Sequence, residues 1–477
     1  MAERLLAIDA GTTTARVCVF DPGGELLART AAPVASTTPE PGRVEQDAEA
    51  IWRTVRRLIR TALDAAGAPP SDVAAIGITT QRTSLVAWDR KTGQPLAPMI
   101  VWSDLRGAER AAELQAAGFP IAPQQAAAKL EGLLDSLPNG RAIAAEAGLA
   151  VGNIDAFLVW KLTGGGAHLT DRSQAWPMGY LDLASMGWNR GLLSLQGADE
   201  AILPRLVDTW GALAVTSRAV FGAAVPITAV IADQQAALIG HGAEGAGDAK
   251  VTYGTSATLD IGTGGAFTFK GTATPPFVVS HVKGETRFCL EGMVFAAGSA
   301  IDWLKQTMGV RGHAAFDALA TQAPDAGGAA FLPALQGLGA PHPDPDRRAL
   351  LAGLSGATGR AEIARAGLEG VAYRVCEILD HLTAGEARPA VLKADGGLAA
   401  SDVLMQLQAD VTGVPVARHA LRDAAAAGAA IAAGRGAGVL DEGDGGGFTR
   451  HDRLFEPAIG VDAAHARFTA WRALTYR

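Results

Sequence analysis

A carboxylate, a glycine and a run of hydroxyls lie close together near the start of the chain. Asp9 ends an apolar segment, and Gly11 and the three threonines at residues 12–14 come before Arg16. Glycine lets backbone N–H groups approach an anion, and threonine hydroxyls add uncharged donors. A carboxylate at this place could hold a hydrated Mg2+ ion beside a phosphate. The spacing predicts a phosphate loop between two strands. A Thr-rich β-hairpin remains the alternative, since no Walker A motif is present.

A second carboxylate follows a strongly apolar segment. Residues 225–232 predict a buried strand, and Asp233 begins the helix expected after it. A carboxylate there is exposed at the end of a rigid element and beside the positive end of the helix dipole. Because Asp is also a common N-cap residue, Asp233 by itself does not separate a catalytic role from a capping role.

Two further strands are expected to end in polar side chains. Arg82 lies just after the buried-type strand 73–79, and Trp102 follows the short apolar strand 100–101. Ligands of α/β sheets collect at the carboxyl ends of strands. We therefore expect these turns to face a common cleft, as the phosphate loop does.

Composition limits the classes of protein to consider. The chain has 477 residues, of which 48% are hydrophobic and 19% charged, so it is long enough for two or more globular domains. A net charge of -8 argues against a nucleic-acid surface and against an anionic membrane surface. Three cysteines at wide spacings predict neither a disulfide framework nor a metal site, which favours a cytoplasmic location. No signal-peptide pattern or membrane span is expected.

Further elements follow from periodicity. Asp47 is expected to cap an amphipathic helix over 48–66, and 122–137 has a helical pattern. Segments 169–176 and 188–193 are expected to be surface elements at the edge of a cleft. Residues 240–247 are rich in glycine, so a domain boundary is placed there. The helix predicted over 423–435 is so poor in large side chains that another backbone or a flat ligand must lie close to it.

The second half of the chain again has predicted strands followed by turns that carry glycine and hydroxyl residues. Strands 250–255 and 257–263 surround a glycine- and hydroxyl-bearing turn, residues 288–295 lead through Gly298 into a helix, and a strand ends at Asp395-Gly396-Gly397. Two such halves around one nucleotide would form a hinged enzyme. Phosphoryl transfer needs a metal-binding carboxylate, donors to the phosphates and a base for the attacking hydroxyl.

Seven of these motifs occur in the order typical of one family. They are residues 8–16, 77–82, 100–102, 232–238, 253–255, 337–341 and 395–397, and a further signature covers 349–369 with Gly367 off its pattern. Together they resemble the FGGY carbohydrate kinases and, within these, the glycerol kinases. The resemblance implies an α/β fold of two ribonuclease-H-like domains, of the actin and hexokinase type, around a central nucleotide cleft. Residues 1–240 would carry the acceptor and the phosphate loop, and residues 241–477 the nucleotide.

The resemblance also implies roles for individual residues, with ATP and Mg2+ as cofactors. Asp233 would be the general base, and the metal-site carboxylates would be Asp9 and Asp233. The phosphates would meet Thr12, Thr13, Thr14 and Arg16. The rest of the nucleotide site would be Thr255, Gly298, Gly397 and Ser401, the last in place of a more usual Asn. The acceptor would contact Arg82, Thr83, Trp102, Gln124, Asp233, Gln234 and Thr258.

Three acceptor positions depart from the glycerol kinase pattern. Thr83 replaces a glutamate, Gln124 a tyrosine and Thr258 a phenylalanine. Fewer side chains would then form hydrogen bonds or contacts with glycerol. These departures predict that glycerol is a poor substrate and that an acceptor of about four or five carbons is better. The segment between Phe221 and Pro226 is also too short for the family's allosteric sugar-bisphosphate loop.

The leading hypothesis is an ATP-dependent, glycerol kinase-like kinase of a small polyol or ketose. The alternatives are a kinase of a C4–C5 sugar or polyol of the erythritol, xylulose or ribulose type, an acyl-phosphate kinase on the same fold, and a non-catalytic sugar sensor. The sensor should have lost Asp9 or Asp233, and both are present. The expected partner is a small polyol or sugar, with neither nucleic acid nor membrane, and a homodimer is considered as the assembly.

Overall fold

The computed structural model describes residues 3–443 and 445–476, and the chain divides into two compact units. Unit 1 comprises Met1–Gly240, Val278–Thr286 and Ala425–Phe448. Unit 2 comprises His241–Phe277, Arg287–Ala424 and Thr449–Arg477. The first segment of unit 1 therefore ends at the boundary placed from the sequence, and two later segments return to unit 1.

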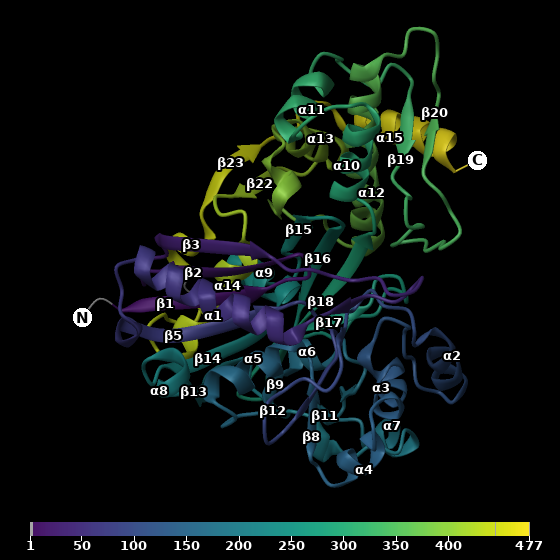
Figure 1. Cartoon of the computed structure of the whole chain (residues 1–477). Coiled ribbons are helices and arrows are strands. Elements are labelled where there is room, and N and C mark those ends of the chain that lie inside the picture. The colour runs from purple at the N-terminus through teal and green to yellow at the C-terminus, as the bar shows by residue number, and fades with distance from the viewer. Residues whose placement is uncertain (1–2, 444, 477) are drawn as a thin grey trace. The chain divides into compact units, whose positions relative to one another are not determined.

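Unit 1 is built on a six-stranded sheet with the order β13-β14-β5-β1-β2-β3 (Figure 1). Strands β14, β5 and β1 are parallel, and the other three are antiparallel to their neighbours. The bounds are β1 Arg4–Ala10, β2 Thr14–Phe20, β3 Leu26–Pro33, β5 Val73–Thr80, β13 Trp210–Val215 and β14 Pro226–Ala232. The register aligns Ala10, Thr80 and Ala232, so the three parallel strands end on the same edge.

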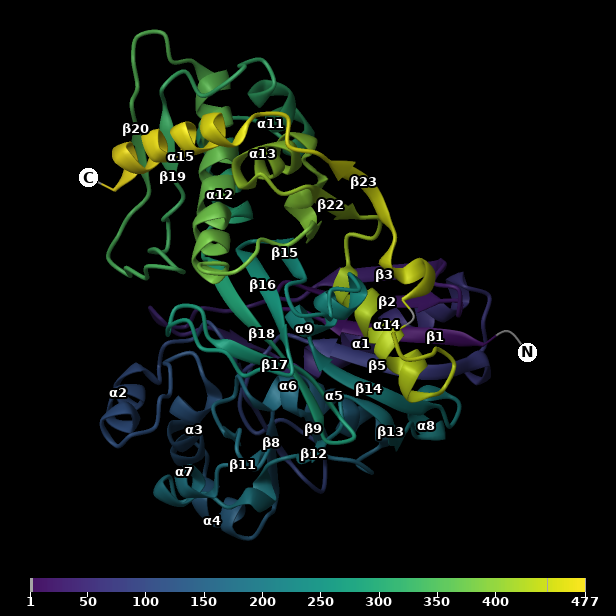
Figure 2. The ribbon, with the colours of Figure 1, turned by 180° about the vertical axis from the view of Figure 1, so that it is seen from behind.

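Helices cover both faces of this sheet. Helices α1 (Ala48–Ala65) and α5 (Ile154–Thr163) lie on one face, and α9 (Asp233–Gly240) and α14 (Ala424–Gly436) lie on the other (Figures 1 and 2). The side chain of Asp47 caps α1 as the sequence predicts, accepting from Ala50 N at 2.9 Å. The smaller elements of this unit are β4 Glu45–Gln46, β6 Val86–Asp89, β7 Met99–Ile100, β8 Leu149–Gly152, β9 Leu169–Asp171, β10 Leu181–Asp182, β11 Gly187–Trp188, β12 Arg205–Val207, α2 Ala108–Ala116, α3 Leu130–Ser136, α4 Gly140–Ala145, α6 Arg172–Ala175, α7 Arg190–Leu195 and α8 Arg218–Phe221.

Helix α14 packs backbone to backbone on the rest of unit 1. A Cβ atom added at Gly428 would lie 1.7 Å from the carbonyl oxygen of Ala236 in α9. One added at Gly77 in β5 would lie 2.1 Å from the carbonyl oxygen of Ala429. Larger side chains at these positions cannot be accommodated without moving the backbone. Of the two neighbours expected for this small-residue helix, another backbone is the one found.

Two expectations about local structure are wrong. Residues 169–176 do not form a surface element, because Leu169, Ser173 and Gln174 are fully buried, whereas the segment 188–193 does carry exposed residues, at Arg190 and Gly191. The helical pattern over 122–137 is interrupted, with a 3-10 turn, η2, at Ala126–Ala128 before α3 begins. The short strand β9 and the four-residue helix α6 are too short to show a periodicity from which burial could be read.

Unit 2 contains most of a seven-stranded sheet with the order β17-β18-β16-β15-β21-β22-β23, and residues 278–286 of its first two strands and their turn belong to unit 1. The strands are β15 Ala249–Tyr253, β16 Ala257–Gly264, β17 Pro276–Val282, β18 Glu285–Val294, β21 Leu392–Asp395, β22 Val416–His419 and β23 His451–Phe455, with the separate pair β19 Ala330–Leu332 and β20 Leu350–Ala352. The helices are α10 Gly298–Thr307, α11 His313–Ala320, α12 Arg360–Leu382, α13 Asp402–Thr412 and α15 Val461–Thr475. Within the described residues, no helix has the length and apolar character needed to cross a bilayer.

Candidate active site

The first turn of the chain holds a carboxylate that is paired with an arginine. Asp9 lies near the end of β1 and is almost fully buried, and Arg16 Nη1 lies 3.0 Å from Asp9 Oδ2 across the hairpin. The turn closes through a hydrogen bond from Gly11 N to Thr14 O at 3.2 Å. Thr13, at the tip, is exposed. Arg16 and the threonine hydroxyls therefore lie around one tight turn, as a phosphate loop requires.

Thr12 connects this turn to the predicted acceptor residues. Trp102 Nε1 donates to Thr12 Oγ1 at 3.0 Å, and Gln46 Nε2 donates to the carbonyl oxygen of Thr12 at 2.7 Å. The indole is thus fixed against the loop instead of being free to rotate. The structure brings Trp102 and the phosphate loop together as the sequence predicts.

Asp233 begins α9 directly after β14 and lies beside Arg82. Arg82 Nε is 3.6 Å from Asp233 Oδ1, and the two side chains retain 11% and 26% of their exposure. The same Asp233 oxygen accepts from Gln234 N at 2.8 Å. An arginine at this distance favours the ionised carboxylate, which is the form that can accept a proton. Gln234, in the first turn of α9, is also partly exposed.

Thr83 turns its hydroxyl toward the backbone. Thr83 Oγ1 donates to Gln124 O at 3.1 Å and accepts from Ala126 N at 2.9 Å. The residue is 8% exposed and has a left-handed backbone, with φ of 49°. Its hydroxyl holds the loop that carries Gln124, whose own side chain is exposed.

Lys129 also binds the loop that carries Gln124. Its Nζ donates to the carbonyl oxygens of Gln124 at 2.8 Å, Val101 at 3.1 Å and Trp102 at 3.4 Å. Burial lowers the pKa of Lys129 to about 8. An ammonium group has three N–H donors, and here each of them has a carbonyl partner. Lys129 thus joins the segment after β7, which carries Trp102, to the loop of Gln124, a function that the sequence motifs did not indicate.

A buried polar network behind β14 was also missed. Ser173 Oγ accepts from Ala232 N at 2.8 Å and donates to Asp171 Oδ1 at 2.8 Å. Gln174 Nε2 donates to Thr80 Oγ1 at 2.9 Å and to Ile231 O at 3.4 Å. The network therefore ties together the ends of β5 and β14, one or two residues before Arg82 and Asp233. Burial raises the pKa of Asp171 to about 6, although hydrogen bonds from Ser173 and Thr209 oppose this shift.

In unit 2, the turn after β15 packs closely against the start of α10 and against the glycine-bearing turn after β21. The start of α10 is bound to the turn after β15, with Gly298 N donating to Gly254 O at 3.0 Å and Ser299 N to Thr255 O at 3.1 Å. A Cβ atom at Gly298 would lie 2.4 Å from that Gly254 oxygen. The turn after β21 is equally close, because a Cβ atom at Gly396 would lie 2.5 Å from Tyr253 O. Thr255 and Gly397 are exposed at these turns.

Two other predicted residues of unit 2 are less accessible. Thr258 is 3% exposed on β16, between Thr252 of β15 and Met293 of β18. Ser401 is the N-cap of α13, where its Oγ accepts from Leu404 N at 3.1 Å and donates to Asp317 Oδ1 at 2.9 Å. Both hydrogen-bonding functions of the Ser401 hydroxyl are thus used within the chain.

The donor set can be compared with the needs of Mg2+. No group of three or more His, Cys, Asp or Glu side chains that could hold a metal is found in the part of the chain that the structure describes. Mg2+ is commonly bound by one or two carboxylates, with water and substrate phosphates as its other ligands. Asp9 lies near the end of β1 and Asp233 directly follows β14; because these two strands flank β5, the two backbones are about 10 Å apart, twice the usual strand spacing. Two carboxylates at such a spacing fit a hydrated magnesium–phosphate group.

Comparison with known proteins identifies the family. The model of the FGGY family of carbohydrate kinases, N-terminal domain, matches residues 4–240, and that of its C-terminal domain matches residues 249–437. The chain belongs to the FGGY family of carbohydrate kinases. This confirms the family and fold predicted from the ordered motifs. It also confirms that the chain is a phosphotransferase with an alcohol group as acceptor.

The similar proteins include several glycerol kinases. The chain is 38% identical to glycerol kinase of Acinetobacter baylyi over 480 residues, covering 98% of this chain and 97% of the relative. It is 39% identical to glycerol kinase of Thermus brockianus over 486 residues, covering 99% and 98%. The Plasmodium falciparum glycerol kinase solved with ADP has a TM-score of 0.90 at 26% identity, covering 99% of this chain and 97% of that one. A xylulose kinase from Lactobacillus acidophilus, with a TM-score of 0.85 at 22% identity and coverage of 99% and 96%, shares the fold.

Proposed function

We propose that this FGGY kinase transfers the γ-phosphoryl group of ATP to a hydroxyl of glycerol, with Asp233 as the general base. The observation that carries the proposal is the placement of Asp233. It lies at the start of α9, partly exposed, with Arg82 Nε 3.6 Å from its carboxylate. A carboxylate held in this way can take the proton of an attacking hydroxyl.

The reaction can be written through the residues of unit 1. The acceptor oxygen forms a bond to the γ-phosphorus while the bond from that phosphorus to the bridging oxygen breaks, and ADP leaves. The acceptor's proton passes to the carboxylate of Asp233. Arg16 and the hydroxyls of residues 12–14 would stabilise charge on the phosphate oxygens. Arg82 and Trp102 would orient the acceptor.

Magnesium would be held by Asp9 and Asp233 through water. When bound, it would neutralise phosphate charge and allow the carboxylates and the phosphates to lie close together. Unit 2 would supply the nucleotide site at the turns of Thr255, Gly298 and Gly397. The ADP bound to the Plasmodium glycerol kinase supports a nucleotide substrate of the ATP type.

Glycerol is proposed because close relatives are glycerol kinases over nearly their full length. The alternative of a four- or five-carbon acceptor is not favoured by them. The departures at Thr83 and Gln124 remain, and the hydroxyl of Thr83 is bound to backbone atoms. Each lost hydrogen bond to a buried hydroxyl costs roughly 1 kcal/mol. We therefore expect glycerol to be the preferred acceptor but to bind weakly.

The test is a coupled assay of ADP release with the purified chain, Mg-ATP and a panel of acceptors. The panel contains glycerol, erythritol, xylulose, ribulose and acetate, with a reaction lacking acceptor as the control. Glycerol should give the highest kcat/KM. A higher kcat/KM for a C4–C5 acceptor would refute the choice of glycerol, and turnover with acetate alone would point to an acyl-phosphate kinase. If no acceptor stimulates ADP release, the kinase assignment itself fails.

A further inference from the structure

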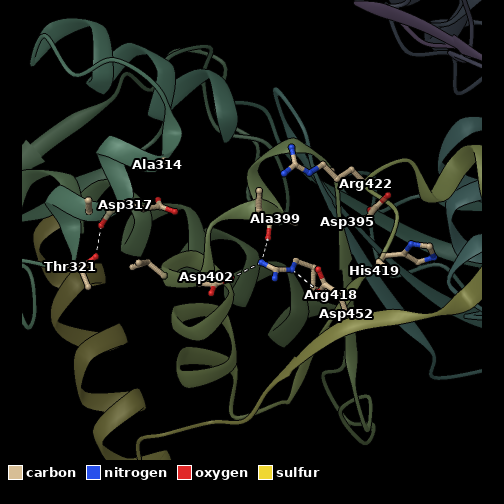
Figure 3. Close-up of a pocket in the computed structure, with 15 residues that line it drawn as sticks. Ala314, Asp317, Thr321, Asp395, Ala399, Asp402, Arg418, His419, Arg422 and Asp452 are labelled. Atoms are coloured by element: carbon tan, nitrogen blue, oxygen red, sulfur yellow. Dashed lines mark hydrogen bonds and ion pairs between the residues drawn. The ribbon is translucent and has the colours of Figure 1, made fainter. Parts of the chain in front are cut away.

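Unit 2 contains a pocket of about 560 Å³ between α11, the 3-10 turn η4 (Gly397–Ala400) and the residues after β22 (Figure 3). Its volume is in the range of sites for small molecules. Part of its lining consists of small apolar side chains, namely Ala314, Ala318, Ala399, Ala400 and Val403. Such a lining lets a planar ring lie close to the backbone. Gly396 also lines the pocket, next to Gly397 of the predicted nucleotide site, so the pocket is suited to the base of the nucleotide.

Four carboxylates line this pocket, and three of them form salt bridges with other side chains of the chain. Asp402 and Asp452 both bind Arg418, at 2.7 and 2.8 Å. Asp395 accepts from Thr252 Oγ1 at 2.6 Å and lies 3.6 Å from His241 Nε2. No salt bridge to Asp317 is found among the described residues. Asp317 therefore differs from the other three carboxylates of this lining in having no salt bridge among the described residues, so no cation of the chain competes with a ligand for it.

The two carboxylate oxygens of Asp317 differ in their hydrogen bonding. Its Oδ1 accepts the hydroxyl proton of Ser401 at 2.9 Å, whereas Oδ2 has no hydrogen-bond partner among the described residues. Figure 3 shows the Asp317 side chain reaching from α11 into the pocket. Burial raises the pKa of Asp317, and the Ser401 hydrogen bond opposes this shift. A partly desolvated carboxylate oxygen gains from an N–H donor on the ligand.

We propose that Asp317 makes the nucleotide site selective for 6-aminopurine nucleotides, by accepting a hydrogen bond from the exocyclic amino group through Oδ2. This inference rests on the proposed kinase function. A 6-oxopurine, such as hypoxanthine, has a carbonyl oxygen where adenine has its amino group, so in the same pose two acceptors would repel, and the base would have to shift for its N1–H to reach Oδ2. Guanine has the same 6-oxo group, and its N1–H and 2-amino N–H groups lie away from position 6, so it would have to shift in the pocket for them to reach Oδ2. The amino group of adenine needs only Oδ2 as its acceptor.

The experiment measures the Kd of ADP and of IDP by isothermal titration calorimetry, without acceptor. The wild type should bind ADP at least tenfold more tightly than IDP, because a site built to pair with a donor discriminates strongly against an analogue lacking it. In Asp317→Asn, the amide oxygen would accept from Ser401 and the amide N–H would face the pocket. The preference should then reverse, with IDP bound more tightly than ADP. Loss of packing alone would not produce such a reversal.

Thr321→Val is the matched control. Thr321 lines the same pocket one turn further along the chain, but its hydroxyl donates to the carbonyl oxygen of Asp317 and not to the pocket. This variant should keep the wild-type ratio of the two Kd values. If Asp317→Asn does not fold, the wild type alone still provides a test: purine riboside 5′-diphosphate, which lacks the amino group, should bind at least tenfold more weakly than ADP.

The outcomes separate the inference from the proposed function. Equal affinities of the wild type for ADP and IDP, or an unchanged ratio in Asp317→Asn, would overturn the role of Asp317 and leave the kinase assignment intact. If the wild type binds neither nucleotide and releases no ADP with any acceptor, the proposed function fails first.

Discussion

Ser173 offers a sharp test of how the catalytic carboxylate is positioned. Ser173→Ala removes the hydroxyl that accepts from Ala232 N and donates to Asp171, both at 2.8 Å. Ser173, Asp171 and Ala232 are all 0% exposed, so water cannot replace the lost bonds. An unpaired buried N–H costs about 1–3 kcal/mol, and the carboxylate also loses one donor. We expect a loss of stability of about 2–4 kcal/mol.

The same substitution should lower turnover, because Ala232 directly precedes Asp233. A displacement of about 1 Å in a catalytic group can cost on the order of 100-fold in rate. We expect kcat to fall about 10- to 100-fold, with the Kd of ADP unchanged. Ser173→Thr, which keeps the hydroxyl, should restore much of the activity.

Thr216→Val is the control for stability alone. Thr216 Oγ1 accepts from Val225 N at 2.9 Å and donates to Ala223 O at 2.8 Å, so it too bridges a backbone N–H and an oxygen, but just before the opposite end of β14. Both variants should lower the melting temperature, but only Ser173→Ala should lower kcat at a temperature where both are folded. Equal kcat values for the two variants would refute the positioning role of Ser173.

Three further predictions concern the phosphate loop, the base and a buried acid. Asp233→Asn should lower kcat by about 10²–10⁴ while leaving ADP affinity close to normal, and near-wild-type kcat would place the base elsewhere. Asp9→Ala should abolish Mg2+-dependent turnover while Thr13→Ala has a milder effect, and equal small effects in a magnesium titration would contradict the phosphate-loop role. Burial raises the pKa of Asp155 to about 7, above its unfolded value of 3.8, so this group contributes stability at low pH that is lost as pH rises toward 7. The melting temperature of the wild type should therefore fall more steeply between about pH 4 and pH 7 than that of Asp155→Asn, and parallel pH profiles would refute this origin.

The sequence was sufficient wherever a motif and a regular element coincide. The β1–β2 hairpin begins with a continuous apolar run that places Asp9 near its end, and the stripe of α1 begins at a recognisable cap. The composition of α14 indicated that another backbone or a flat ligand lies close to it, and a backbone is what is found there. These features depend on residues that are close in sequence, or on side chains whose size alone limits what can pack there.

The features that could not be predicted depend on hydrogen bonds between residues that are far apart in the sequence. Ser173 bonds to Ala232 and Ser401 bonds to Asp317, and neither pair leaves a local signal. The hydroxyl of Thr83 was expected to face the acceptor, yet the backbone at Gln124 and Ala126 binds it. Polar side chains have several possible partners, and tertiary structure decides among them.

Helix α14 has a consequence for how the chain is made. The sheet of unit 1 is complete once Gly240 has been synthesised, but the helix that covers β5 and β14 begins only at Ala424. At bacterial or eukaryotic synthesis speeds the delay is on the order of ten seconds or more. During that time this face of the nascent sheet is covered by α9 alone, and the surface that α14 will cover stays exposed. We expect a fragment that ends at Gly240 to aggregate, and the full-length nascent chain to depend on chaperones until α14 emerges from the ribosome.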